Sequence, residues 1–231
     1  MTANRPSPFL VISSVALGVV LFGFSFTYWG ALFSGFEFPP LIHVHAALWF
    51  GWFGLLLGQA LLISGGRKAL HETLGAVIGA YTAVLIGVSS FLAISALARS
   101  ADLITGGFES VQSIIPLSQI LMFTAFFGAA MVRRSNPSHH RRWLMLAALV
   151  GGTPALARIS IGLLGGPNVP LIFAVSSGLV IAVAVADRQR HGQFHPVYLW
   201  GGLAIILVRV VRVPVAMTPM WAEFAQQLSA R

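Results

Sequence analysis

The side chains of this sequence with the clearest chemical potential are arginines and histidines inside or beside long apolar runs. Arg158, Arg209 and Arg212 fall within such runs, and His43 and His45 stand at the start of another. An ionisable side chain at the centre of a bilayer costs about 3 kcal/mol or more, so its presence there favours a functional role. Because guanidinium groups pair best with carboxylates and phosphates, the three arginines indicate a site for an anion.

Helix geometry predicts that these residues lie at similar depth near one end of a bundle. Arg158 lies 18 residues beyond His140, which corresponds to about 27 Å of helix. Arg209 lies 14 residues beyond His195, or about 21 Å. The predicted ligand-binding cluster at this outer end comprises His43, His45, Gln119, Arg158, Arg209 and Arg212.

Two interpretations of the arginines stay open. The acidic residues able to reach them, Glu37 and Glu109, are in predicted loops, so a propionate, a lipid phosphate, a carboxylate substrate or a loop glutamate would each supply the missing charge. Alternatively, the arginine side chains extend to lipid headgroups, which Arg212 could do more easily than the deeper Arg158. His43 and His45 point about 200° apart in a regular helix, so both face one ligand only if His43 lies on the entry turn.

Histidines at the opposite, inner end are candidates for haem or metal ligation. His71, His140 and His195 each precede an apolar run and neighbour basic residues. Haem b is usually held between two histidines on different helices, so His71 with His140 or His195 is a candidate pair, and Arg67 or Arg141 could hold the propionates. The competing interpretation is a neutral imidazole at a helix start in contact with headgroups.

Composition restricts the class of protein. Of 231 residues, 57% are hydrophobic and 9% are charged, whereas about a quarter of the residues of a soluble domain are charged. The net charge of +8 comes mostly from short loops, and without a long basic tail or a binding motif we expect no nucleic-acid partner. The chain has no cysteine, which excludes disulfides, thiolate metal sites, iron–sulfur clusters and covalently attached c-type haem.

Seven apolar runs have the length of about 20 residues that a helix needs to cross a bilayer. They predict an all-α fold, a polytopic membrane helix bundle of about seven transmembrane helices that forms a single domain over 1–231 and has the lipid bilayer as a partner. The predicted spans are 9–33, 41–64, 74–98, 112–132, 143–164, 170–186 and 197–218.

The distribution of basic residues predicts the orientation. With the N-terminus in the cytoplasm, the inner segments contain nine of the 14 lysines and arginines, from Arg5 to Arg190, and the outer segments contain Arg99 and Arg231. This bias follows the positive-inside rule. After the last span, the segment from Thr218 to Leu228 predicts a short helix in the outer interface, with Trp221 as its anchor.

Three short motifs in a fixed order resemble a group of uncharacterised bacterial multi-span inner-membrane proteins. They are H-x-x-L-G at 71–75, H-R-R-W-x-M at 140–145 and A-x-x-R at 155–158. The resemblance implies a multi-pass protein of the bacterial inner (plasma) membrane with unknown function. A more distant likeness to b-type membrane cytochromes, and to small proteins that help assemble haem–copper oxidases, rests on histidines at helix ends.

Three functions are compatible with these features. The leading hypothesis is a redox or oxidase-assembly protein associated with haem, such as haem b, or with a quinone. The first alternative is a carrier or receptor for a small organic anion, and the second is a non-catalytic accessory subunit that contacts a membrane-protein partner. The sequence does not decide whether the protein is an enzyme.

Overall fold

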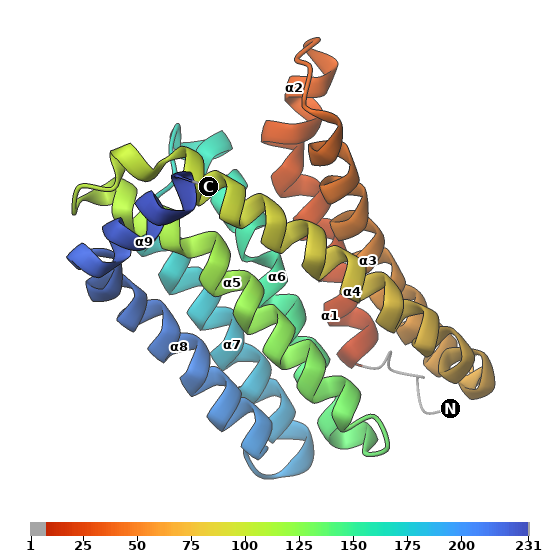
Figure 1. The fold of residues 1–231 in the computed structure, drawn as a ribbon. Coiled ribbons are helices and arrows are strands. Elements are labelled where there is room, and N and C mark those ends of the chain that lie inside the picture. The colour runs from red at the N-terminus through yellow and green to blue at the C-terminus, as the bar shows by residue number, and fades with distance from the viewer. Residues whose placement is uncertain (1–7, 231) are drawn as a thin grey trace. The chain divides into compact units, whose positions relative to one another are not determined.

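The computed structural model describes residues 8–230, which form helices and turns and contain no strand (Figure 1). Its elements are α1 (Pro8–Phe24), the π-helical turn η1 (Ser25–Trp29), α2 (Gly30–Phe33), α3 (Pro40–Ser64), α4 (Lys68–Arg99), the 3-10 turn η2 (Ala101–Leu103), α5 (Phe108–Val132), α6 (Pro137–Leu164), α7 (Val169–His191), α8 (Pro196–Ala216) and α9 (Pro219–Ser229).

Seven helices in the described residues are long and apolar enough to cross a membrane, with Phe9–Phe33 as the first. This confirms the predicted all-α fold and the predicted number of helices of membrane-spanning length. Arg5 and Arg231, which contributed to the predicted orientation, lie outside the described residues, and the cytoplasmic N-terminus stays a prediction.

Several helices are longer than the apolar runs that predicted them. Helices α4, α5 and α6 begin four to six residues before the predicted spans that start at 74, 112 and 143. Helix α7 continues to His191, whereas its predicted span ends at 186. An apolar run identifies only the part of a helix that suits the hydrocarbon of a membrane. The backbone hydrogen bonds of the helix continue through the polar residues at its ends. In α4 the added turn contains an exposed Lys68–Glu72 ion pair of 3.4 Å at the favourable i,i+4 spacing.

Proline is the first residue of five described helices, α1, α3, α6, α8 and α9. Pro40, Pro196 and Pro219 occupy the first turns of α3, α8 and α9, where the fixed φ of proline suits a helix and its missing N–H leaves no bond unmade. His195 and Thr218 accept hydrogen bonds from the backbone N–H groups that follow in α8 and α9 and so stabilise these starts.

The chain divides into two compact units. Unit 1 comprises Met1–Leu85 and Gly151–Ser176, and unit 2 comprises Ile86–Val150 and Ser177–Arg231. The single domain over 1–231 stays a prediction.

Small residues bring the helices of unit 1 close together. A Cβ atom on Gly23 of α1 would meet the backbone of Ala155 in α6, and one on Gly162 would meet the ring of Phe26. In helices of an apolar environment, close packing replaces much of the hydrophobic driving force. The first helix therefore lies against the second half of α6, on a stripe that contains Arg158.

Unit 2 has its core where α5, α6 and α8 pack together. Leu146 and Ile205 are fully buried, and the Trp143 ring stacks on Phe126 with 5.6 Å between centroids. Gly201 leaves room for Leu146, because a Cβ atom there would overlap that side chain. This packing positions the polar residues at both ends of α8.

The C-terminal helix α9 packs inward through Trp221. Its indole Nε1 donates to Ser113 Oγ at 2.9 Å, and the ring packs against the buried cluster of Leu97, Ala101, Ile104 and Ala225. Trp221 is therefore held by the protein, and the apolar side chains that α9 exposes are Met220 and Phe224.

Candidate functional site

The predicted site residues fall in both units. Unit 1 contains His43, His45, Arg158 and the inner-end candidate His71. Unit 2 contains Gln119, Arg209, Arg212 and the inner-end candidates His140 and His195. The polar groups thus form three clusters, one in unit 1 and two in unit 2.

In unit 1, Arg158 lies on the stripe of α6 that faces α1. It follows Ala155 by three residues and precedes Gly162 by four, and both contact the first helix. Its guanidinium carbon lies 5.2 Å from the centroid of the Phe24 ring, a cation–π contact. Among residues 8–230 no hydrogen bond or ion pair to this guanidinium is found.

Unit 1 contains two further polar side chains that are candidates for a site, His45 and Thr27. The positive charge of Arg158 acts on the His45 ring, and that ring is 6.5 Å from the Trp49 ring. Thr27 belongs to the π-helical turn, and its hydroxyl is buried without a hydrogen-bond partner in the described part of the chain. Single π-helical turns are often found at functional sites, so this region of unit 1 is a candidate for binding a polar group.

His43 has a partner of its own. Its Nδ1 atom lies 2.7 Å from the phenol oxygen of Tyr28, and the rings of Phe38 and Phe50 lie 5.4 Å and 6.0 Å from the Tyr28 ring. His43 and His45 contact different residues, as their spacing of two predicts. Sequence reasoning missed Tyr28, because nothing local signals which aromatic residue of the first helix meets α3.

In unit 2, α8 contributes two arginines one helical turn apart. Arg209 is 4% exposed, and its Nη1 donates to Ser177 Oγ at 3.3 Å. Arg212 is half-buried. Its Nη1 lies 3.5 Å from Ser118 Oγ, a distance longer than that of an ordinary hydrogen bond. The Nε atom of Arg212 is buried with no partner in residues 8–230.

Gln119 neighbours Ser118 in α5 and is also half-buried. Its Oε1 atom is buried and, within the described residues, lacks a hydrogen-bond partner. The arginine cluster of α8 thus has the donors and the polar neighbours that an anionic ligand requires.

Sequence reasoning missed the shortest ion pair in residues 8–230, between Arg142 and Asp187, because it counted Arg142 only as a topology signal. Arg142 is 2% exposed and Asp187 is 12% exposed. Arg142 donates from Nε and Nη2 to the two carboxylate oxygens of Asp187 at 2.9 Å and 2.8 Å. Its Nη1 donates to the Ser138 carbonyl at 2.8 Å and to the Ser138 hydroxyl, so this bidentate pair ties α6 to α7.

His191 is the third side chain around the Asp187 carboxylate. Its Nδ1 donates to the Asp187 backbone carbonyl at 2.8 Å. Its Nε2 lies 3.2 Å from Nη2 of Arg141 and must accept this bond, because arginine has only donors.

His195 is the N-terminal cap of α8. Its Nδ1 accepts the backbone N–H of Val197 at 3.2 Å, which leaves the proton on Nε2, 3.4 Å from Ser138 Oγ. Burial, and then the positive charge of Arg142, lower the pKa of His195. His195 therefore acts as a helix cap, a role that the haem hypothesis did not consider.

A hollow of about 430 Å³ opens beside these residues in unit 2. It is lined by Ser138, Arg142, Asp187, His191, Gln193, Phe194, His195 and Pro196. We call this the polar hollow.

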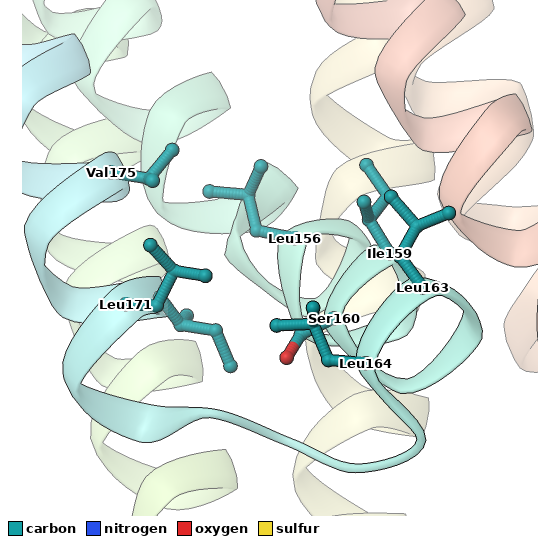
Figure 2. Close-up of a pocket in the computed structure, with 8 residues that line it drawn as sticks. Leu156, Ile159, Ser160, Leu163, Leu164, Leu171 and Val175 are labelled. Atoms are coloured by element: carbon teal, nitrogen blue, oxygen red, sulfur yellow. The ribbon is translucent and has the colours of Figure 1, made fainter.

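A second hollow, of about 180 Å³, lies in unit 1 between the end of α6 and the start of α7 (Figure 2). Figure 2 shows leucine, isoleucine and valine side chains around it and one hydroxyl, from Ser160. That hydroxyl donates to the Gly166 carbonyl at 2.8 Å and accepts the Asn168 N–H at 2.9 Å. Its hydrogen bonds thus close the α6–α7 turn.

The remaining haem candidates are His71 and His140. His71 is half-buried in the first turn of α4. His140 Nδ1 lies 2.8 Å from the Ala130 carbonyl, so its Nε2 is the nitrogen left for a ligand. Within residues 8–230, no group of three or more histidine, aspartate or glutamate side chains has the arrangement of a metal site.

No protein-family model, curated protein or solved structure matches this chain. The described features define a class, an all-α protein with seven helices of membrane-spanning length and arginines inside them. The resemblance to uncharacterised bacterial inner-membrane proteins and to b-type cytochromes stays a prediction.

Proposed function

We propose that this chain is a multi-pass protein of the bacterial inner membrane that binds a small organic anion, as a carrier or a receptor. The observation that carries the proposal is Arg212, a span arginine whose described contacts are one long approach to Ser118 and whose Nε is buried without a partner. Such a cation is costly inside a membrane, and a bound carboxylate or phosphate would offset the cost.

Arg209 strengthens the case, because it is a second cation one turn away on the same helix and 4% exposed. Like charges at i and i+3 repel each other, and an anion near both would relieve this repulsion. In unit 1, Arg158 independently supports binding of an anion. Its guanidinium lies over the Phe24 ring, and its positive charge acts on the His45 ring.

The test is thermal unfolding of the detergent-purified protein with acetate, succinate, benzoate and phosphate. At 100 times its dissociation constant a ligand stabilises a protein by about 2.7 kcal/mol, which corresponds to about 5–11 °C for a chain of this size. We expect at least one anion to give such a shift and Arg212→Gln to abolish it.

Arg99→Gln is the matched control, because Arg99 is an exposed arginine at the end of α4 and its loss changes the net charge equally. The proposal fails if no anion raises the unfolding temperature, or if Arg99→Gln removes the shift as fully as Arg212→Gln does.

A redox role is the second candidate, favoured by two observations. The Tyr28–His43 hydrogen bond within aromatic rings offers a proton donor and acceptor for a quinone headgroup. The bond from His140 Nδ1 to a backbone carbonyl is the kind of contact that orients a ligating histidine.

Visible spectra of protein purified from its native host, oxidised and dithionite-reduced, test the haem form of this candidate, and solvent extraction tests for bound quinone. Absence of both a Soret band and a quinone would remove it. A subunit that co-purifies without any cofactor or anion effect would instead favour a non-catalytic accessory role.

A further inference from the structure

Basic side chains are in excess at the end of unit 2 where α5 turns into α6 and α7 turns into α8 (Figure 1, lower end). Segments 133–142 and 187–196 together contain six arginines and four histidines but a single acidic residue, Asp187. With neutral histidines their net charge is six minus one, or +5. This end of the unit therefore attracts anions.

The Asp187 carboxylate repels an anion only weakly, because the positive charge of Arg142 compensates its negative charge. Both oxygens of Asp187 accept hydrogen bonds from Arg142, which is itself buried. The Arg142–Asp187 pair is close to neutral as a unit, so the other arginines decide the potential in the polar hollow.

Two of these arginines, Arg141 and Arg188, contact residues that line the polar hollow, and each has N–H donors left over. Arg141 uses one N–H for His191, which lines the polar hollow. The guanidinium carbon of Arg188 lies 4.7 Å from the centroid of Phe194, another lining residue. Each guanidinium has five N–H donors, so both can bind phosphate oxygens while they keep their present contacts.

The dimensions and the helix ends suit the same ligand. A volume of about 430 Å³ lies within the range of about 300–1,000 Å³ that is usual for ligand pockets. Ser138 and Pro196, from the first turns of α6 and α8, line the polar hollow. Helix N-termini carry partial positive charge, which favours phosphate.

We propose that the polar hollow binds the phosphate of an anionic phospholipid, with Arg141 and Arg188 as its main contacts and the Gln193 amide as an additional donor. A lipid fits better than a free phosphate compound because apolar surface adjoins the polar hollow. Leu199 and Trp200, in the turn of α8 after Pro196, are 52% and 70% exposed and offer a surface for acyl chains. Basic pockets between membrane helices are known to hold lipid headgroups. This proposal does not depend on the anion site at Arg212.

The test is native mass spectrometry of the full chain in mild detergent, titrated with dioleoylphosphatidylglycerol, dioleoylphosphatidylcholine and sn-glycerol 3-phosphate. We expect retention of one phosphatidylglycerol in preference to phosphatidylcholine. One charge near an anionic headgroup changes affinity about fivefold, so Arg141→Gln with Arg188→Gln weakens binding about thirtyfold. Circular dichroism and the unfolding temperature without lipid show whether this variant is folded.

Arg133→Gln with Arg134→Gln is the matched control. These exposed arginines lie in the α5–α6 turn at the same end of unit 2, and the two substitutions remove the same amount of charge. We expect it to weaken binding by less than about threefold. Equal loss in both double variants would mean attraction by diffuse surface charge and would overturn the site. Equal retention of the two lipids, or displacement of the lipid by sn-glycerol 3-phosphate at similar concentration, would overturn a lipid as the occupant. Loss of lipid in the Arg141/Arg188 variant alone, with the Arg212 variant unchanged, separates this site from the proposed anion site.

Discussion

Replacing Asp187 by asparagine should strongly destabilise unit 2. The substitution keeps the shape of the side chain but leaves Arg142, which is 2% exposed, without an opposite charge. Removing one partner of a buried ion pair costs about 3–5 kcal/mol. Asp187 is 12% exposed, and the asparagine oxygen can still accept one of the two bonds, so we expect the lower limit of about 3 kcal/mol.

For a chain of this length, 1 kcal/mol corresponds to about 2–4 °C, so Asp187→Asn should lower the unfolding temperature by about 6–12 °C in detergent. Glu72→Gln is the matched control, because it neutralises the carboxylate of the exposed Lys68–Glu72 pair and should change the temperature by less than about 2 °C. Replacing Arg142 and Asp187 together by leucine should recover most of the loss, since no charge then stays buried.

Equal unfolding temperatures for Asp187→Asn and Glu72→Gln would refute this reasoning. They would mean that water reaches Arg142 in the folded protein and that the bidentate pair contributes little.

Three further outcomes are expected from thermal unfolding. Gly23→Ala should cost about 1–3 kcal/mol, because the new Cβ atom meets backbone of α6, whereas Gly18→Ala on the same helix meets nothing within 4 Å and should not destabilise. Stability should fall as the pH drops below 6.5, the ordinary pKa of histidine, because the lowered pKa of His195 makes the unfolded chain bind the proton first; His195→Asn, which can still cap α8, should weaken this dependence. Trp221→Phe should cost about 0.5–1.5 kcal/mol through loss of its hydrogen bond to Ser113.

Each of these outcomes has a result that would contradict it. Equal effects at the two glycines would mean that α1 does not pack closely on α6. An unchanged pH dependence in His195→Asn would assign the titration to another histidine. Trp200→Phe is the control for Trp221, since Trp200 is 70% exposed, and equal losses for the two tryptophans would remove the role of the Ser113 bond.

The seven long apolar helices were predictable because their signal is local. A helix that crosses hydrocarbon must satisfy its own backbone hydrogen bonds, so a run of about 20 apolar residues suffices to identify it. The same locality explains the error at helix ends, where α6 begins at Pro137 instead of 143. Polar residues there continue the helix beyond the hydrocarbon and leave no hydropathy signal.

The sequence identified the charged residues of the candidate sites, but it did not predict most of the residues that contact them. Arg158, Arg209 and Arg212 stood out because charge inside an apolar run is rare. Their neighbours could not be predicted, since Ser118 lies 94 residues from Arg212 along the chain. Tyr28, the partner of His43, was missed for the same reason.

By itself the sequence determined that the chain forms seven apolar helices and that three of them carry arginine or histidine at defined positions along the helix, since hydropathy and helical rise are properties of consecutive residues. Only the tertiary structure decided which charges are compensated. Arg142 looks like any loop arginine until α6 and α7 pack together and Asp187, 45 residues away, meets it. Arg212, which looks equally able to reach water, has its Nε buried by packing within unit 2, because burial and pairing depend on which helices become neighbours.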